Sequence, residues 1–561
     1  MKKVLFILLG CLLSFNVMAQ VKAISGLVTD VTGEPVIGAS VVEVGTTNGV
    51  ITDLNGKFSL KVAPNSQFLV SYIGYKQQTI KVGSESTYNI VLKEDAEVLD
   101  EVVVVGYGSQ KKVNVTGAVG MVGAEALEAR PVANASQALQ GVVPGLNLTV
   151  GNNGGALDGT LNMNIRGAGT IGDGSGSSPL VLIDGIEGDL NTVNPNDIES
   201  VSVLKDAASA SIYGARASFG VILVTTKSGK SGKTNVSYSG SARFSDAIGV
   251  PDIMDSYTFA QYFNRASANK GGGDIFAPAV MERIKAYQEG TLKATTVDNG
   301  AGIWQKWANA NGDTDWFEEF YDHWAPSQEH NLSINGGTDK TQYLISGSFL
   351  DQKGLMRHGK DKFQRYTLNG KITTAVTDWF KVTYSTKWTR EDFERPSYLT
   401  GNFFHNLARK WPVHPAYDPN GFPMDEGEVE QMENGGKQNS QKDFYTNQLQ
   451  LVFEPIKNWK INLDGSVRTT TQYQHWEVLP VYAYNVAGDP YYTVWDMGYG
   501  SYAAGSSRVN EYSWKENYYT TNIYSDYFKQ FDNGHYFKVM AGFNAELYKT
   551  RNITAEKNTL I

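Results

Sequence analysis

Cysteine is almost absent from this chain, since Cys11 is the only one among 561 residues. Disulfides therefore cannot hold the fold together, and strand pairing and buried apolar surface have to do so. Basic residues are also in deficit, because 49 lysines and arginines stand against 58 aspartates and glutamates. The formal net charge of -9 argues against a nucleic-acid-binding protein, whose contact surface would be basic.

Long apolar runs are missing as well. No run in the sequence reaches the roughly 18 residues of a membrane-spanning helix, which excludes a helical membrane protein. A β-barrel remains possible, because its strands alternate apolar and polar side chains. Hydrophobic residues make up 41% and aromatic residues 12% of the chain, which is enough to build large cores and too much for a disordered protein.

The amino terminus has the pattern of a secretory signal peptide. Lys2 and Lys3 precede an apolar stretch over residues 4–13, and small or tolerated residues follow it. We expect cleavage after Ala19, which makes this an exported protein. Because Cys11 lies inside the removed segment, the exported chain would contain no cysteine.

Residues 20–95 are predicted to form a small β-sandwich. Alternating segments at 24–30, 39–44, 58–62 and 68–72 are separated by turn residues. The pattern resembles the regulatory-like domain of carboxypeptidases, on Gly26, Asp30, Gly33, Pro35, Gly38, Ala39, Gly45, Thr46, Thr52, Asp53, Gly56, Phe58 and residues 71–75. The resemblance implies no peptidase, because this domain is non-catalytic in its relatives and the histidines lack zinc-binding spacing.

Four consecutive valines, at 102–105, follow an acidic linker. Such a run has a high β propensity and is an aggregation hazard when it is unpaired. It is either an ordinary buried strand or a strand offered to the sheet edge of a partner, and its position between two domains favours the second. The sequence LDEVVVVGYGSQKK resembles the TonB-box region of the SusC/RagA family of TonB-dependent outer-membrane transporters. This resemblance assigns TonB binding to Asp100, Glu101, Val102, Val103, Val104 and Val105.

Residues 111–230 mix helix and strand signals with many glycines. The segment 179–229 is similar to the second half of the plug domain of that family along nearly its whole length. We expect a helix over residues 196–207 and a strand over 220–227. The plug-motif residues that the resemblance marks are Asp184, Gly185, Lys205, Asp206, Tyr213, Gly214, Arg216 and Gly220.

The sequence changes to long alternating strands from about residue 231. Residues 459–468 place Trp459, Ile461 and Leu463 on one face and polar residues on the other, and 380–388 and 537–547 behave alike. A soluble sandwich shows the same alternation. However, soluble strands average about 5–6 residues and membrane-barrel strands need about 9–11. Short turns also alternate with long loops here, which favours an outer-membrane barrel.

The strand count bears on the extent of the chain. We count roughly nine strands, whereas bacterial barrels have an even number. The SusC/RagA resemblance implies 22 strands on a chain nearly twice as long, so the sequence is expected to be an amino-terminal fragment. An open barrel leaves a sheet edge unpaired in lipid, and we do not expect this piece to insert alone.

The predicted protein is therefore mainly β, with a small β-sandwich, an α+β plug domain and part of a transmembrane antiparallel β-barrel. Its parts are a signal peptide (1–19), the β-sandwich (20–95), a linker with the TonB box (96–110), the plug (111–230) and the partial barrel (231–561).

Two loops of the predicted barrel carry unusual side chains. One is rich in aromatics and contains Trp304, Trp307, Trp316 and Trp324. Packing within the loop is the favoured interpretation, and stacking against sugar rings is the alternative. The other holds an acidic cluster of Asp425, Glu426, Glu428 and Glu430, which we interpret as a solvated face because calcium-binding spacing is lacking.

We predict TonB-dependent import of an oligosaccharide-type nutrient, with the plug gating the barrel. The family resemblance implies TonB with its inner-membrane energising proteins, a SusD-like surface lipoprotein as a lid, a glycan or peptide substrate, and outer-membrane lipid as partners. We find no nucleophile, acid/base pair or metal site in the sequence, and so predict a non-enzyme without a cofactor. The alternative is a secreted or surface-attached all-β binding or adhesion protein.

Overall fold

The computed structural model describes residues 22–46, 48–64, 66–72, 75–93, 102–105, 108–111, 118–128, 130–150, 156–157, 159, 161–167, 178–493, 495–496, 501–502, 505–531 and 535–559. The predicted signal peptide, Asp100 and Glu101 lie outside these residues. The chain divides into two compact units, one ending at Thr116 and one beginning at Gly117.

The first unit contains a seven-stranded β-sandwich, as predicted. One sheet has the order β4-β1-β7 and the other β3-β2-β5-β6. Residues Phe58, Leu60 and Val62 alternate with exposed neighbours along β4, so every second side chain enters the core. The strands are β1 (Lys22–Thr29), β2 (Ser40–Glu43), β3 (Gly49–Ile51), β4 (Lys57–Val62), β5 (Gln67–Ser71), β6 (Gln78–Lys81) and β7 (Thr87–Val91).

The valine run forms a strand of its own. Strand β8 (Val102–Val105) pairs antiparallel with β9 (Gly108–Lys111), and these two strands make a separate two-stranded sheet. One edge of β8 therefore has no partner strand among the described residues.

The plug is a five-stranded sheet in the order β10-β15-β16-β13-β14, with an apolar core between the sheet and two short helices. A separate hairpin, β11–β12, lies beside it. The elements are β10 (Val119–Gly123), α3 (Ala124–Glu128), α4 (Ala135–Leu139), β11 (Leu146–Val150), β12 (Leu161–Ile165), β13 (Leu180–Ile183), β14 (Ile186–Glu187), β15 (Ile198–Leu204), α5 (Ala207–Ala210) and β16 (Val221–Thr226), with 3-10 turns η2 (Leu190–Thr192), η3 (Pro195–Asp197) and η4 (Ser211–Ala217).

The helix predicted over residues 196–207 is wrong. Residues 198–204 form β15, which pairs with β10 on one side and β16 on the other. Val201 and Val203 are fully buried there, and a central strand suits β-branched side chains better than a helix does. A single 3-10 turn, η3, precedes this strand, and the next helix, α5, begins only at Ala207. The strand predicted over 220–227 is present as β16.

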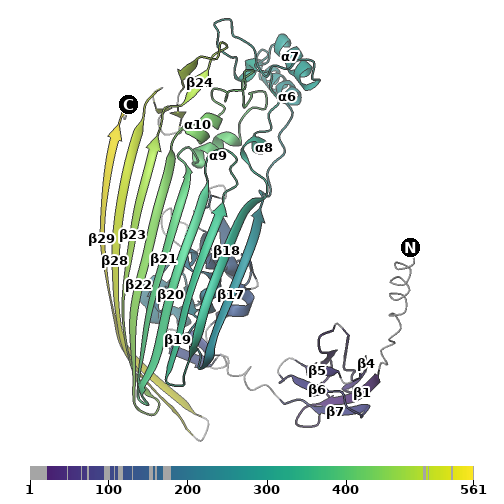
Figure 1. Ribbon diagram of the computed structural model, residues 1–561, viewed down its shortest axis with the longest axis vertical. Helices are drawn as coiled ribbons and strands as arrows, with labels where there is room; N and C mark the ends of the chain where they lie inside the picture. The colour runs from purple at the N-terminus through teal and green to yellow at the C-terminus, as the bar shows by residue number, and fades with distance from the viewer. Residues whose placement is uncertain are drawn as a thin grey trace, which may run out of the picture. The chain divides into compact units, whose positions relative to one another are not determined.

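The carboxy-terminal part is one antiparallel sheet of nine strands (Figure 1). Each strand pairs with the next along the chain, and most are far longer than the strands of soluble proteins. They are β17 (Gly232–Ser245), β18 (Ala325–Gly337), β19 (Thr341–Lys353), β20 (Lys362–Thr377), β21 (Phe380–Pro396), β22 (Lys437–Ile456), β23 (Trp459–Val478), β28 (Arg508–Gln530) and β29 (Tyr536–Asn558).

The connections alternate in length, as predicted. Short turns join β18 to β19, β20 to β21 and β22 to β23 at one end of the sheet, and the long loops gather at the other end (Figure 1). The long loops contain α6 (Ser256–Asn269), α7 (Pro278–Gln288), η5 (Trp307–Asn309), α8 (Trp316–Phe320), α9 (Gly401–Leu407), α10 (Val429–Asn434), β24 (Tyr482–Tyr484), β25 (Pro490–Tyr492), β26 (Trp495–Asp496) and β27 (Ser501–Tyr502). Within the described part of the chain, every helix is too short or too polar to span a bilayer.

In the nine-stranded sheet the exposed face is apolar and the covered face is polar, which is the opposite of a soluble sandwich. On β23, Val467 is 40% exposed and its neighbour Ser466 only 5%. On β21, Tyr384 is 43% exposed and Ser385 only 5%. The apolar side chains therefore lie on the open face and the polar ones on the covered face, which is the arrangement of an outer-membrane barrel wall.

Candidate functional site: the plug and its seat on the sheet

A two-residue turn brings the first plug-motif residues to the sheet. Asp184 and Gly185 connect β13 to β14 with positive φ angles of 51° and 85°, which an Asp-Gly pair accommodates well. The Asp184 carboxylate accepts hydrogen bonds from the Thr226 backbone N–H (2.9 Å) and hydroxyl (2.6 Å). These bonds fix the turn against β16 of the plug.

The same carboxylate also reaches the sheet. Asp184 forms an ion pair with Lys387 of β21, and its backbone carbonyl accepts a hydrogen bond from Gln448 of β22 (3.0 Å). Burial alone would raise the pKa of Asp184, but Lys387 and Lys371, with the hydrogen bonds from Lys387 and Thr226, hold it below its usual range. Asp184 is therefore an anion that fastens the plug to β21 and β22 of the nine-stranded sheet, which we call the wall.

The segment after this turn makes a second set of contacts with the wall. Asn194 donates hydrogen bonds to Glu329 (3.2 Å) and Asn331 (2.5 Å) of β18. Asp197 accepts hydrogen bonds from Ser346 of β19 (2.7 Å) and Asn369 of β20 (2.8 Å). Residues 184–197 thus span the strands from β18 to β22 with side-chain hydrogen bonds.

We call the contacts between the plug and the nine-stranded sheet the seat of the plug. Arg365 of β20 is the most deeply buried charge at this seat, with 1% exposure. It donates hydrogen bonds to two plug carbonyls, those of Asn191 (2.9 Å) and Ala133 (2.5 Å). One guanidinium thereby joins two plug segments that are distant in sequence. Without Arg365, the carbonyls of Asn191 and Ala133 would lose these hydrogen bonds.

A further set of charged contacts joins the plug to β23 and β29. Arg216 makes a bidentate pair with Glu546 of β29 (2.6 and 2.7 Å) and contacts Glu187 (3.1 Å). Tyr548 of β29 donates a hydrogen bond to Glu187 (2.8 Å), and Arg468 of β23 donates one to the Glu187 carbonyl. The bidentate geometry gives this contact a fixed direction.

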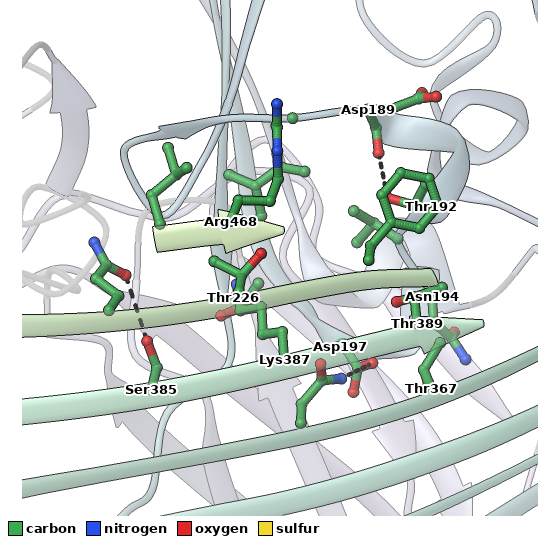
Figure 2. A pocket seen from close by; sticks show the side chains of 18 of the residues that line it. Asp189, Thr192, Asn194, Asp197, Thr226, Thr367, Ser385, Lys387, Thr389 and Arg468 are labelled. Atoms are coloured by element: carbon green, nitrogen blue, oxygen red, sulfur yellow. Dashed lines mark hydrogen bonds between the residues drawn. The ribbon is translucent and has the colours of Figure 1, made fainter. Parts of the chain in front are cut away.

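A cavity of about 300 Å³ lies between plug and wall. Figure 2 shows Lys387 and Arg468 of the sheet and Asp197 and Thr226 of the plug around it. The apolar core of the plug lies within the plug itself, and the contacts described above are polar. Water can replace hydrogen bonds and ion pairs of this kind.

The remaining plug-motif residues support the plug from within. The Lys205 ammonium donates a hydrogen bond to the Pro144 carbonyl (2.6 Å). Asp206 caps α5 by accepting from the Ser209 N–H (2.9 Å) and also accepts from the Ala118 N–H (2.6 Å). The Ser209 and Ala118 hydrogen bonds lower the pKa of Asp206 to about 2.

Two glycines and a tyrosine complete the motif. Gly214 has φ 65° and ψ -150°, a conformation that only glycine adopts readily. At Gly220 (φ 91°), a Cβ atom would lie 2.8 Å from the Leu204 carbonyl oxygen. Tyr213 is buried beside them. These positions set the path of the chain from α5 into β16.

Among the described residues, no group of three histidine, cysteine or acidic side chains could hold a metal ion. The described contacts between the plug and the sheet are hydrogen bonds and ion pairs. Sequence reasoning missed Arg365, Lys387 and Arg468, although charged residues on the polar face of an alternating strand were a usable signal.

Two family models match the chain. The TonB-dependent Receptor Plug Domain matches residues 111–221, and the CarboxypepD_reg-like domain matches residues 24–104. The TonB-dependent receptor SusC of Bacteroides thetaiotaomicron is 35% identical over 377 residues, which are 65% of this chain and 33% of SusC. The chain belongs to the SusC/RagA family of TonB-dependent receptors.

Two further proteins are similar to most of the chain. TonB-dependent receptor P39 of Formosa agariphila is 32% identical over 414 residues, covering 72% of this chain and 36% of P39. The RagAB peptide importer in its open-open state is 24% identical with a TM-score of 0.64, covering 82% of this chain and 50% of that one, so the two share a fold. The chain spans 33–36% of the curated relatives SusC, P39 and P3.

The loop tryptophans of this SusC/RagA chain lie in different environments. Trp316 is fully buried and donates a hydrogen bond to the Trp411 carbonyl (3.0 Å), so its ring has no face open to a ligand. Trp324 is 66% exposed, and Trp304 and Trp307 are partly buried. For Trp316 the structure shows the loop packing that the sequence favoured.

The acidic cluster is only in part the solvated face that the sequence indicated, since Glu426 is exposed, Asp425 and Glu430 are half-buried and Glu428 is buried. Asp425 and Glu426 form ion pairs with Lys306 (2.7 and 2.6 Å). Glu428 is buried and pairs with Lys410 (3.2 Å). Lys306 lies 119 residues from Asp425 and 120 from Glu426, and Lys410 lies 18 residues from Glu428, so only the folded loops bring these lysines to the carboxylates.

His358 joins two loop helices. One ring nitrogen contacts Glu319 of α8 (2.9 Å) and the other Glu433 of α10 (2.8 Å), so both nitrogens donate when the ring is protonated. Burial would lower the pKa of His358, but the two carboxylates outweigh it and raise the pKa above its usual value. When protonated, the ring links α8 and α10 through both carboxylates.

We expect the link through His358 to weaken at alkaline pH. A raised folded-state pKa gives stability that is complete below the unfolded value of about 6.5 and is lost as the pH rises through the folded value. The loss is about 1–2 kcal/mol of local stability, since one carboxylate is half exposed. Hydrogen exchange of α8 and α10 at pH 6 and pH 9 measures it. His358→Gln should remove this dependence, whereas His405→Gln at the exposed α9 position should keep it.

Proposed function

We propose that this protein is part of a TonB-dependent importer of the outer membrane, which takes up an oligosaccharide-type nutrient. The nine-stranded sheet forms part of the barrel wall, and the plug closes the lumen. The observation that carries the proposal is the seat of the plug. A domain matched as a TonB-dependent receptor plug is fastened to the polar face of the sheet by hydrogen bonds and ion pairs.

Energy enters through β8 in this proposal. TonB adds a strand to the free edge of Val102–Val105, and several main-chain hydrogen bonds then share the pull. The pull displaces the plug, whose polar contacts can exchange with water. A SusD-like surface lipoprotein acts as the lid over substrate that is captured outside. No catalytic step is part of this function.

Growth and localisation test the proposal together. Deletion of the complete gene should abolish growth on one polysaccharide in a panel of single carbon sources, and deletion of tonB should abolish it equally. The gene product should fractionate with the outer membrane. Recovery of the protein from the culture fluid, or growth that is independent of TonB, would instead support the adhesion alternative.

A further inference from the structure

The cavity of about 300 Å³ between plug and wall carries opposite charge excesses on its two sides. The wall contributes four cations, Lys371, Lys387, Lys442 and Arg468, and the single carboxylate of Glu516. We call these four cations the cationic row. The plug contributes three carboxylates and one cation, which are Glu187, Asp189, Asp197 and Lys227. An acidic segment of the plug therefore covers a cationic part of the wall (Figure 2).

The strand register spreads the cationic row along the wall. Lys387 and Arg468 lie at one level of the sheet. Lys371 lies two residues from this level on one side, and Lys442 lies four residues from it on the other. At about 3.4 Å per residue, the cationic row is about 20 Å long. This length exceeds a single small anion and matches a chain that carries several anionic groups.

Two lysines of the cationic row have no ion-pair partner. Among the described residues, neither Lys371 nor Lys442 lies within ion-pairing distance of a carboxylate. Lys442 instead lies over the Phe444 ring, 4.8 Å from its centre. The wall carboxylate opposite Lys442 in the register, Glu391, is shared with Arg365 on its other side. The seat of the plug does not account for these two lysines, because neither donates a hydrogen bond or an ion pair to it.

The other two members of the cationic row contact the plug. Lys387 pairs with Asp184 of the plug and would lose that carboxylate if the plug left the wall. Arg468 donates a hydrogen bond to the Glu187 carbonyl of the plug, but it also pairs with Glu516 of the wall (3.0 Å) and would keep this partner. The ammonium groups of all three lysines would then lack an ion-pair partner. Cations along a passage attract anions and repel other cations.

An uncovered row of this kind favours one class of ligand. A neutral chain would leave the ammonium groups without a counter-charge, and a cationic chain would be repelled. We propose that the cationic row binds the anionic groups of the imported substrate, for which the plug carboxylates stand in while the plug is seated. The proposal rests on the proposed function, because the plug has to leave the wall before substrate can reach the row.

Ion selectivity of the open channel tests the cationic row. The complete gene product is placed in planar bilayers, the plug is displaced with urea, and the reversal potential is measured under a gradient of potassium chloride. Lys371→Gln combined with Lys442→Gln should lower the permeability ratio of chloride to potassium about 3-fold or more, because the two lysines attract anions into the passage. An oligogalacturonate should block the current at a lower concentration than its uncharged methyl ester, and the double variant should weaken this block.

A matched pair of substitutions provides the control. Lys270→Gln combined with Lys293→Gln makes the same change of charge at two exposed loop positions and should alter the permeability ratio little. An unchanged ratio in the Lys371 and Lys442 double variant, or equal block by both probes, would overturn the assignment. So would an unchanged ratio with a shifted urea concentration for opening, which would show that the lysines only hold the plug. Uptake that is independent of TonB contradicts the proposed function, whereas an unchanged ratio with TonB-dependent uptake contradicts the row alone.

Discussion

Val104→Pro is expected to abolish TonB-dependent uptake while leaving substrate binding unchanged. Strands β8 and β9 are joined by two residues, so Val105 and Gly108 form a hydrogen-bonded pair and the pairs alternate from there. By this alternation Val103 faces β9, and Val104 directs its N–H to the free edge. Proline removes that donor from the edge on which a TonB strand would pair.

Uptake by Val104→Pro should fall to that of a tonB deletion strain, because a short strand has few other N–H donors on that edge. Uptake of labelled substrate by cells that carry the complete gene measures it. Val104→Thr keeps the N–H and the β-branched shape, and should retain uptake. Uptake that is lost in Val103→Pro and kept in Val104→Pro would show that TonB displaces β9 instead.

Asp184→Asn should loosen the plug by about 3 kcal/mol, the low end of the range for breaking a buried ion pair, because Lys387 keeps 23% exposure. Asparagine tolerates the positive φ of this turn, so the change removes charge and little else. The Lys387 ammonium is then left without its carboxylate partner. We expect faster hydrogen exchange over β13 and β14, and channel opening at a lower urea concentration in planar bilayers.

A charge change elsewhere in the same segment provides the control. Asp189 is exposed and accepts a hydrogen bond from the Asn191 N–H within its own turn (2.9 Å), so Asp189→Asn should leave the plug in place. Adding Lys387→Met to Asp184→Asn removes the uncompensated cation and should restore much of the stability. If the double variant is as loose as the single one, the ion pair is not what holds this turn.

Local patterns in the sequence were sufficient for much of the fold. The alternation at Phe58, Leu60 and Val62 predicted a strand of the sandwich, and about nine barrel strands were expected where nine form one sheet. The Asp184–Gly185 turn is likewise a local preference. Residues 198–204 were mispredicted as helix, because tertiary pairing on both sides decides a central strand more than local propensity does.

The candidate sites were less accessible from sequence. Arg365 and Ala133 are 232 residues apart, and Lys306 and Asp425 are 119 apart. Each is an unremarkable charged or small residue in its local context. A cavity among the long loops is likewise lined by residues from three separate parts of the sequence, after β17, β21 and β23.

The sequence by itself determined where the strands, turns and plug motif lie, since side-chain alternation and turn preferences act over a few residues. Strand length and the alternation of turns and loops favoured a barrel wall over a soluble sandwich, but the period of two does not by itself say which face of each long strand is covered. Only the tertiary structure decided this. It places the plug on the polar face, where Asp184 and Arg216 meet charged partners from the strands, and leaves the apolar face open.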